Sequence, residues 1–522
     1  MRRLLLLLLI GFAVSLTSCR NDFDFESSTG GLRFSKDTVY LDTVFTNIGS
    51  STYTLKVYNK SDKNISIPKV QLAKGAASKY RMMVDGMPGK VFDNVELLAK
   101  DSMFIFIEVT ADVADANPTD FLYTDQILFG EGPNTQKVEL VTLIQDAYFI
   151  FPQRTQNPDE TYTYESLNLG LDDEGNPITI RGQYLDEADP INGNELHFNN
   201  TKPYVIYGYA AVPSTKTLVI DPGARVHFHA ESGLIVANNA SIHVNGAPST
   251  TAALENEVIF ESDRLEPDFA EVPGQWGTLW LTPGSTDNQI KNLTIKNATV
   301  GLLVTGDDGS PTPTLDIENT QIYNCANVGI LARTGNIEGR NVVINNCGQA
   351  SLACTNGGSY DFTHCTFANY WSSPSQTCLV MDNEDIIVDN ITIPTLLTNT
   401  NFKNCIFYGS SNLSIKLTKK GGVFDYSFKN CLIKFADFSN QFTNNPLYAF
   451  SNASLFDTCI IATNSTVNKP DFKDATKNQL IIGEDSAAKG MADASYSTFN
   501  DILNNPRTGA TDIGAYNWIT FD

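Results

Sequence analysis

The sequence predicts an all-β protein, in which a β-sandwich precedes a solenoid of stacked parallel β-coils. Residues 32–150 alternate apolar and polar side chains with a period of two, in β-branched and aromatic runs such as Thr38–Phe45. From residue 292 onward, short apolar runs alternate with turn residues at a period of 22 to 28 residues. Because 42% of residues are hydrophobic and only 18% charged, a disordered chain is excluded.

The first nineteen residues are typical of a lipoprotein signal peptide. Arg2 and Arg3 precede an apolar run over residues 4–14, too short at about 1.5 Å per residue to cross a hydrocarbon core of about 30 Å. Leu16-Thr17-Ser18-Cys19 has the residue order of a lipobox, at which bacterial lipoprotein precursors are cleaved. We expect Cys19 to carry two or three acyl chains, which anchor a protein stably. The alternative is an ordinary secretory signal with an incidental cysteine.

Charge and the residues after Cys19 predict where the chain resides. Without Arg2 and Arg3 the chain has 34 basic against 59 acidic residues, a net charge of −25. This excludes nucleic acid as a partner and leaves the lipid to hold the chain on an anionic membrane. Residues 20–31 are expected to be a flexible tether, and their acidic start resembles the surface-export signal of Bacteroidetes lipoproteins. We expect lipid anchoring to the outer membrane, facing the cell surface, with retention on the periplasmic side as the alternative.

Residues 32–150 are expected to form one β-sandwich without disulfides. Several strands separated by Asp85-Gly86, Pro88-Gly89 and Glu131-Gly132-Pro133 turns within about 120 residues favour two packed sheets. The runs 34–45 and 101–109 resemble the immunoglobulin-like domain that opens a family of Bacteroidetes surface lipoproteins. Members of that family join this domain to a right-handed parallel β-helix of the pectate-lyase-like kind. The resemblance implies an architecture and supplies no catalytic motif.

After a linker or insert at 151–200, residues 201–522 are expected to form the β-helix. Asn-x-x-[Ile/Phe]-x-Asn units begin at Asn292, Asn319 and Asn341, and a variant begins at His364, with offsets of 27, 22 and 23. Strands of three to five residues need the coils above and below them, and Asn at one turn can form a ladder along the stack. Leucine-rich repeats share the period, but the chain lacks their L-x-x-L-x-L frame.

Two irregularities and the chain end complete this prediction. Later units contain Phe402, Phe428 and Phe456, 26 and 28 residues apart, whereas the step from Phe367 to Phe402 is 35 residues and indicates an insertion. The final residues, 505–516, are expected to be a C-terminal cap that covers the last coil.

Eight cysteines lie between residues 325 and 459. Six are expected at about the same place in the coil: Cys325, Cys347, Cys365, Cys405, Cys431 and Cys459. A column of inward-facing thiols is favoured, with one or two disulfides between neighbouring coils as the alternative. The absence of a C-x-x-C pair argues against zinc.

The chemistry-bearing residues form no recognisable catalytic constellation, and no metal site is predicted. His227, His229 and His243 are the only histidine cluster; two or three of them could bind a transition metal, but surface polar roles are favoured. Asp307-Asp308 could be a hydrolase carboxylate pair and is more typical of a turn.

Residues suited to a polysaccharide lyase are present but scattered. Arg333, Arg340, Lys419 and Lys420 could supply a base, and the acidic loop 382–385 could hold Ca²⁺ as the one candidate cofactor. Solvated surface charge is the favoured reading of all of them.

Two functions therefore remain open. The first is a cell-surface lipoprotein without catalysis, whose β-helix presents a long binding face to a polysaccharide or an envelope protein. The second is a polysaccharide lyase or glycoside hydrolase. Tyr370-Trp371 could serve either as a sugar platform or in packing on the coil. Fold alone does not decide, because one fold hosts many functions.

Overall fold

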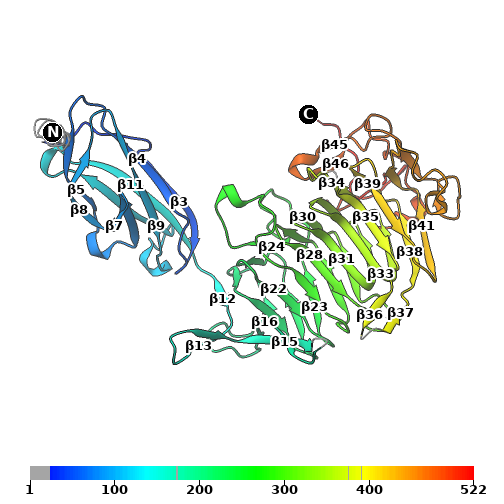
Figure 1. Cartoon of the computed structure of the whole chain (residues 1–522). Helices are drawn as coiled ribbons and strands as arrows, with labels where there is room; N and C mark the ends of the chain where they lie inside the picture. The colour runs from blue at the N-terminus through cyan, green and yellow to red at the C-terminus, as the bar shows by residue number, and fades with distance from the viewer. Residues whose placement is uncertain (1–23, 172–173, 374, 389–390, 522) are drawn as a thin grey trace, which may run out of the picture. The chain divides into compact units, whose positions relative to one another are not determined.

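The computed structural model describes residues 24–171, 174–373, 375–388 and 391–521. The predicted signal peptide, the lipidation site Cys19 and the first residues of the tether lie outside these described residues. The chain divides into two compact units, Met1–Asp146 and Ala147–Asp522. In the described ranges the regular elements are β-strands and short 3₁₀ turns (Figure 1). Within the same ranges, no helix has the length and apolarity needed to cross a membrane.

The first unit consists of two sheets that share one core. One sheet has the order β1-β5-β10-β11-β3 with β8 beside β5, and the other has the order β2-β4-β9-β6-β7. Val39, Leu55, Ile105 and Leu140 are completely buried between them, as period-two strands require. The strands are β1 (Glu26–Ser27), β2 (Arg33–Phe34), β3 (Thr38–Phe45), β4 (Tyr53–Tyr58), β5 (Ile65–Leu72), β6 (Tyr80–Val84), β7 (Met87–Gly89), β8 (Val91–Leu97), β9 (Ser102–Val109), β10 (Leu122–Phe129) and β11 (Gln136–Gln145).

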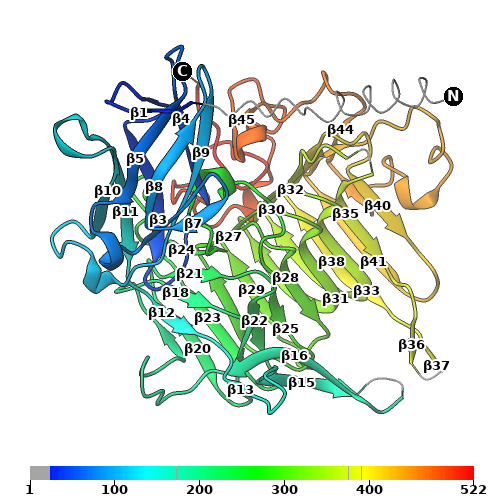
Figure 2. The ribbon, with the colours of Figure 1, turned by 60° about the vertical axis from the view of Figure 1, so that its left-hand side comes forward.

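The second unit is a stack of coils, and most coils contribute one strand to each of three faces. Strands of successive coils pair in parallel, which is compatible with a β-helix (Figures 1 and 2). Face 1 comprises β12 (Tyr148–Ile150), β18 (Tyr204–Ile206), β21 (Arg225–Phe228), β24 (Val258–Ser262), β27 (Leu293–Lys296), β30 (Gln321–Cys325), β32 (Val343–Cys347), β34 (Thr366–Asn369), β39 (Ile406–Gly409), β42 (Leu432–Lys434) and β44 (Ile460–Ala462).

Faces 2 and 3 share two long strands, β31 and β33, which bend from one face to the other. Face 2 comprises β16 (Pro177–Tyr184), β19 (Tyr209–Val212), β22 (Gly233–Val236), β25 (Leu279–Leu281), β28 (Val300–Thr305), the first halves of β31 (Val328–Arg340) and β33 (Ala350–Thr363), β35 (Thr377–Asp382) and β40 (Ile415–Thr418). Face 3 comprises β17 (His197–Phe198), β20 (Thr217–Ile220), β23 (Ser241–Asn245), β26 (Asn288–Lys291), β29 (Leu315–Glu318), the second halves of β31 and β33, β38 (Leu397–Lys403), β41 (Phe424–Lys429) and β43 (Phe456–Asp457).

Residues 151–200, expected as a linker or insert, contain five strands. β13 (Arg154–Gln156) and β14 (Tyr162–Tyr164) form a hairpin, and β15 (Ser166–Leu171) pairs with β16. β16 and β17 already belong to the parallel faces, so the stack begins before residue 201.

The recurring Asn residues occupy single-residue corners between faces. At the corner from face 3 to face 1, seven residues have a left-handed backbone with φ between 48° and 54°: Asn292, Asn319, Asn341, His364, Asn404, Asn430 and Thr458. Asn adopts this conformation more readily than most residues, which explains its recurrence. One step of the predicted ladder is present at this corner, where Asn341 Nδ2 donates to Asn319 Oδ1 at 2.8 Å.

The repeat contains a second left-handed corner, from face 1 to face 2, at Asn297, Asn324 and Asn346. Cys325 and Cys347 follow this corner, whereas Cys365, Cys405, Cys431 and Cys459 follow the first one. The prediction of one place in the coil for all six is therefore wrong, because Asn precedes the cysteine at both corners. The eight described cysteines are free thiols, buried except for the half-buried Cys459.

The predicted insertion is a hairpin in the coil between β34 and β39. Phe362 pairs with Phe402 across face 3, so equivalent positions lie 40 residues apart. The step of 35 residues expected from Phe367 to Phe402 joins residues on different faces, because Phe367 lies on face 1 and Phe402 lies on face 3. The extra residues form β36 (Ile386–Val388) and β37 (Ile391–Ile393), which are labelled at the lower right of Figure 2.

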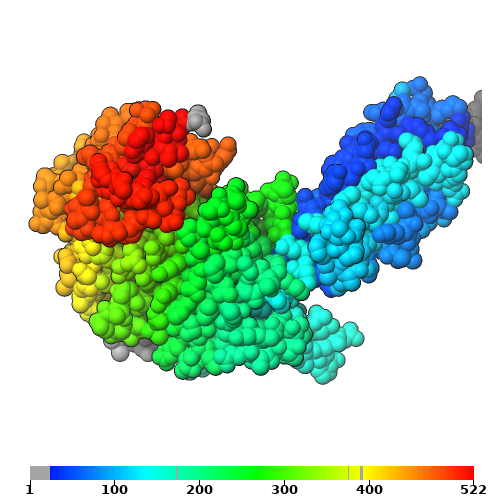
Figure 3. Space-filling view, turned by 180° about the vertical axis from the view of Figure 1, so that it is seen from behind, coloured from blue at the N-terminus to red at the C-terminus, as the bar shows by residue number. Residues whose placement is uncertain are grey.

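The expectation that residues 505–516 cover the last coil is wrong. Phe442, Tyr448 and Phe450 pack on the aromatic core at that end, so residues 437–455 cover it. The C-terminal segment, residues 469–521 with β45 (Phe472–Asp474) and β46 (Gln479–Ile482), instead runs back along face 1 (Figure 3). It lacks the repeat, so its sequence does not indicate its position.

Phe402 tests the contribution of the interior stack to stability. Its ring lies between Phe362 and Phe428, with centroid distances of 5.7 and 5.0 Å. We expect Phe402→Ala to lower the free energy of unfolding by about 3–5 kcal/mol, measured by denaturant titration, because it leaves a cavity. Phe438→Ala is the control, since that ring is 71% exposed and should change little. Equal losses in both variants would contradict a packed interior.

Candidate functional site

The outer side of face 1 is covered along most of its length. Tyr323, Val343 and Ala368 pack against Leu480, Ile502, Ala515 and Tyr516 of the C-terminal segment. Ile406, Tyr408 and Leu432 pack against Ile482, Ala488 and Ile513. Face 1 is therefore an internal interface of the second unit, and an extended ligand has no room there.

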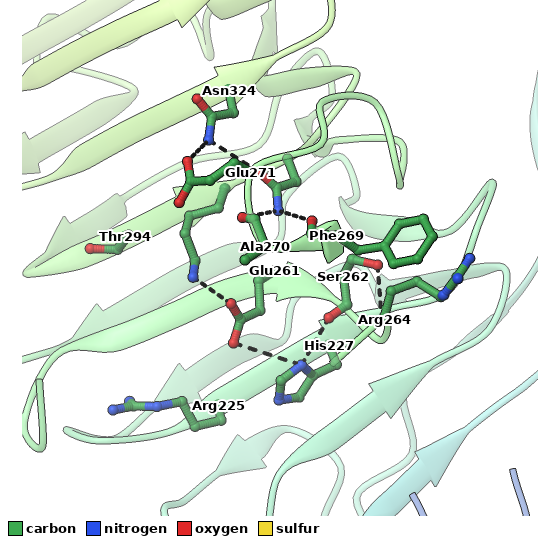
Figure 4. Close-up of polar contacts among 12 residues, drawn as sticks. Arg225, His227, Glu261, Ser262, Arg264, Phe269, Ala270, Glu271, Thr294 and Asn324 are labelled. Atoms are coloured by element: carbon green, nitrogen blue, oxygen red, sulfur yellow. Dashed lines mark hydrogen bonds and ion pairs between the residues drawn. The ribbon is translucent and has the colours of Figure 1, made fainter. Parts of the chain in front are cut away.

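A charged cluster lies farther along face 1, near the loop 263–275 (Figure 4). Lys296 Nζ lies 2.6 Å from Glu261 Oε2, and His227 Nδ1 lies 3.0 Å from Ser262 O and 3.9 Å from Glu261 Oε1. Burial opposes ionisation of Glu261, but the charges of His227 and Lys296 hold its pKa below the ordinary value. Burial also lowers the pKa of His227.

Corner asparagines hold the loop 263–275 in place. Asn297 Nδ2 donates to Ala270 O at 2.9 Å, and Asn324 Nδ2 donates to Glu271 Oε2 at 2.5 Å. His227 is only 5% exposed. We therefore assign a structural role to the Glu261–Lys296–His227 cluster.

Face 2 carries three hollows in its outer surface. Hollow A, about 740 Å³, contains Arg181, Tyr207, Tyr209 and His229. Hollow B, about 650 Å³, contains Tyr184 and Trp280 among apolar residues of β15, β19 and β22. Hollow C, about 540 Å³, contains Arg333, Asp382, Glu384 and Lys416. All three volumes lie in the range of about 300–1,000 Å³ typical of ligand sites.

One ladder of paired residues connects the three hollows. Its eight members occupy neighbouring coils and each lines a hollow: Ala211, Ile235, Trp280, Leu303, Leu331, Ala353, Val380 and Lys416. With strands about 4.8 Å apart, the ladder spans about 34 Å. It is apolar except for its last member, and Ala211, Ile235 and Ala353 are buried, the first two in a cluster with Leu167 of β15. A polar column with Thr305, Arg333, Thr355 and Asp382 runs beside it.

Hollow A contains an ordered acid–base pair. His229 Nδ1 lies 2.7 Å from Asp263 Oδ2, and the Asp263 side chain is 6% exposed, whereas that of His229 is 46% exposed. The ring of Tyr207 stacks on His229 at 4.3 Å, and burial together with the charge of Asp263 raises the pKa of Tyr207 to about 12. The carboxylate therefore orients the imidazole through its Nδ1.

The surface role favoured for the three histidines is wrong for His227, which is buried, and the structure does not bring the three together at one site. His227 is buried on face 1, and His229 pairs with Asp263 at hollow A. His243 lies on face 3, with Nε2 3.2 Å from Asp287 Oδ2. The alternation of side chains along the strand correctly predicts that His227 and His229 lie on one side of it. It does not show that only His227 is buried. In the described ranges, no group of three His, Cys, Asp or Glu side chains is arranged to hold a metal ion.

The structure brings together some of the predicted lyase residues. Arg333 lies in hollow C with Asp382 and Glu384 of the acidic loop, and Lys420 lies 3.3 Å from Glu384. Arg340 points from face 3, where its guanidinium lies 2.9 Å from Asp316. These residues therefore belong to two faces.

The acidic loop 382–385 has the hydrogen bonds of a turn. Asp382 Oδ1 accepts from the backbone N–H groups of Asn356 and Glu384, at 2.9 and 3.1 Å. Asn383 is buried and its side-chain amide donates to Gly421 O and Val423 O. Calcium at this loop remains a prediction.

Two further candidates have structural roles. Asp307 and Asp308 accept hydrogen bonds from the backbone of Gly309 and Ser310, which is the turn expected from the sequence. Tyr370 packs on Phe472 of the C-terminal segment with ring centroids 6.3 Å apart. The sugar platform considered for Tyr370 is therefore not available.

The comparisons with known proteins are distant. No protein-family model and no curated protein matches the sequence. Among solved structures, the catalytic unit of a GH87 α-1,3-glucanase from Streptomyces thermodiastaticus is 11% identical, with 74% of this chain and 76% of that chain covered and a TM-score of 0.27. The periplasmic chaperone SfaE is 14% identical (29% and 84% covered, TM-score 0.16). A family 123 glycoside hydrolase from Clostridium perfringens is 7% identical (26% and 43% covered, TM-score 0.15). TM-scores this low carry no argument about function.

The buried His227 predicts a pH dependence of stability. Its pKa in the folded chain lies below the ordinary value of 6.5, so the unfolded chain binds the proton first. The free energy of unfolding should therefore fall as the pH drops below about 6.5, by at most about 1.4 kcal/mol per pH unit for one such group. His227→Gln should flatten this decline between pH 7 and 5 in denaturant titrations.

The exposed His197 is the matched control, because its side chain is 48% exposed beside Asp221. His197→Gln should leave the slope unchanged. Burial lowers the pKa of His364 to about 3, so His364 contributes to the slope in the same direction and is replaced as well. A wild-type slope that persists when both His227 and His364 are replaced would contradict the assignment.

Proposed function

We propose that this protein binds an extended polysaccharide along face 2, as a lipid-anchored protein of the cell envelope. The observation that carries the proposal is the ladder from Ala211 to Lys416, which links three hollows over neighbouring coils. A ligand of repeated units matches a surface of repeated coils, because each coil offers a similar contact. Tyr209 and Trp280 supply ring surfaces, and the neighbouring polar column supplies hydrogen-bonding groups.

The architecture belongs to the same proposal. We infer that the second unit is a right-handed parallel β-helix of the pectate-lyase-like kind and that the first unit is immunoglobulin-like. The three parallel faces and the two-sheet sandwich support these assignments. Anchoring at Cys19 to the outer membrane, with the chain exposed at the cell surface, rests on the lipobox and on the acidic residues that follow it.

Trp280 provides the first test of binding. Its indole lies on the ladder, with Nε1 2.8 Å from Thr305 Oγ1. We expect Trp280→Ala to weaken binding of the preferred polysaccharide at least tenfold, measured by affinity electrophoresis and calorimetry over a panel of neutral and acidic glycans.

Trp518→Ala is the matched control, because that indole is 37% exposed on the C-terminal segment and lies over Lys489. It should bind like the wild type. Binding that is unchanged in Trp280→Ala while its melting temperature also stays constant would remove face 2 from the proposal.

A second candidate is a polysaccharide lyase or glycoside hydrolase, and the Asp263–His229 pair favours it. A buried carboxylate that orients an accessible imidazole is suited to proton transfer. The assay is release of reducing ends, with absorbance at 235 nm for unsaturated products, with and without Ca²⁺. We expect His229→Gln to abolish any turnover while His243→Gln leaves it unchanged. Absence of turnover on every glycan that binds would leave binding alone.

A further inference from the structure

Face 3 carries a separate polar trough of about 500 Å³. Its floor is the outer side of β31, β33 and β38, and Pro311 and Pro313 form one rim. The other rim is Ser495, Tyr496, Thr498 and Phe499 of the C-terminal segment. The trough therefore exists only because a distant part of the chain packs beside this face.

The floor presents acceptors and donors in register. Glu338 and Asp361 line the trough on neighbouring strands, and Asp316 pairs with Glu338 from β29, just outside the lining, so the three carboxylates repeat about every 4.8 Å. Arg340 in the adjacent column lies 2.9 Å from Asp316 and 3.0 Å from Glu338, and Lys403 Nζ lies 2.6 Å from Asp361. These side chains remain between 20% and 43% exposed, so they are accessible to a ligand.

Ion pairs as exposed as these contribute little to stability, typically about 0–1 kcal/mol each. What they fix is orientation, since a guanidinium and two carboxylates with defined geometry can bind neighbouring hydroxyl groups of a sugar. The lining of the trough contains two carboxylates, Glu338 and Asp361, and two cations, Arg340 and Lys403. Each cation already lies within 3.0 Å of a carboxylate, so neither is available to neutralise an acidic sugar, and the trough favours neutral or amino sugars.

The aromatic rim suits the same ligand. Tyr496 lies with its ring 5.5 Å from Lys403 Nζ, at the edge of the charged floor. Phe499 meets the ring of His364 edge to face, with centroids 5.7 Å apart. Both rim residues are partly exposed, so apolar sugar faces can pack on them while hydroxyl groups meet the floor.

His364 holds this rim. It occupies a corner where five other coils have Asn. Its Nδ1 lies 3.2 Å from Gly514 O and therefore carries the proton, while Nε2 lies 2.8 Å from Ser497 Oγ. Burial and the nearby Arg507 lower the pKa of His364 to about 3, so the ring is neutral near pH 7. The longer side chain thus contacts the C-terminal segment at two points, Ser497 within the rim and Gly514 farther along the segment.

We propose that the trough is a second carbohydrate site, specific for short oligosaccharides of neutral or amino sugars, and that His364 is its positioning residue. This goes beyond the proposed function, because the trough shares no residue with the hollows of face 2. The two sites can therefore be tested separately on the same protein.

The test is calorimetric titration of the full chain with four tetrasaccharides: cellotetraose, mannotetraose, tetraglucosamine and tetragalacturonate. We expect a neutral or amino tetrasaccharide to bind and tetragalacturonate to bind at least tenfold more weakly at the trough. Asp361→Asn and Tyr496→Ala should each weaken the bound tetrasaccharide at least tenfold. Lys429→Met is the matched control, since Lys429 pairs with Lys403 one coil farther along face 3 and lies outside the trough.

His364 needs a readout that fold stability alone would not change. His364→Asn restores the usual corner residue, and Ser497→Ala removes one contact without altering the corner. Both variants should weaken tetrasaccharide binding at the trough three- to tenfold. Binding of the polysaccharide that depends on Trp280 reports on face 2 and should stay constant. The proposal is overturned if no neutral or amino tetrasaccharide binds, or if binding survives Asp361→Asn and Tyr496→Ala. Equal binding in wild type, His364→Asn and Ser497→Ala would overturn the role of His364.

Discussion

The single-residue corner between faces 3 and 1 is the constraint on which the second unit depends. A strand can enter face 1 after one residue only if that residue adopts a left-handed backbone, and Asn does so at low cost. At several coils the Asn side-chain amide points outward from this corner. It then binds either the next amide, as between Asn341 and Asn319, or the C-terminal segment, as when Asn404 Nδ2 donates to Asp493 O at 2.9 Å. One backbone requirement thus supplies both the ladder and the attachment of the last fifty residues.

This attachment decides which surfaces remain for ligands. Because the C-terminal segment and the loop 263–275 occupy the outer side of face 1, its polar groups, including the Glu261–Lys296 pair, serve packing. Parts of faces 2 and 3 stay open, with different chemistry, although β15 packs on the first coils of face 2. Face 2 is a long apolar ladder with a polar margin, whereas the trough on face 3 has a floor of paired charges.

The sequence predicts the elements of this protein better than its surfaces. Period-two runs and the Asn repeat depend on local backbone requirements, so the sandwich strands and the coils could be predicted from them. Arg333 and Arg340 show the limit of prediction from local pattern. They lie seven residues apart in one strand, but a register shift between Arg333 and Gly335 turns the strand from face 2 to face 3. Likewise, His227 is buried beside Ser262, 35 residues farther along the chain, and Tyr370 packs on Phe472, so local periodicity carries no information about either burial.

The two open surfaces also depend on the fold in different ways. A ligand on face 2 would contact successive coils, so its binding energy would add to the interfaces between neighbouring coils and stabilise the stack as a whole. The trough on face 3 has a floor from three strands, and His364 and Asn404 hold one of its two rims. Loss of the C-terminal segment would therefore remove the trough together with the cover of face 1, while the ladder from Ala211 to Lys416 contains no residue of that segment. The His364 corner thus links a position in the repeat to the rim of one surface, through its contacts with Ser497 and Gly514.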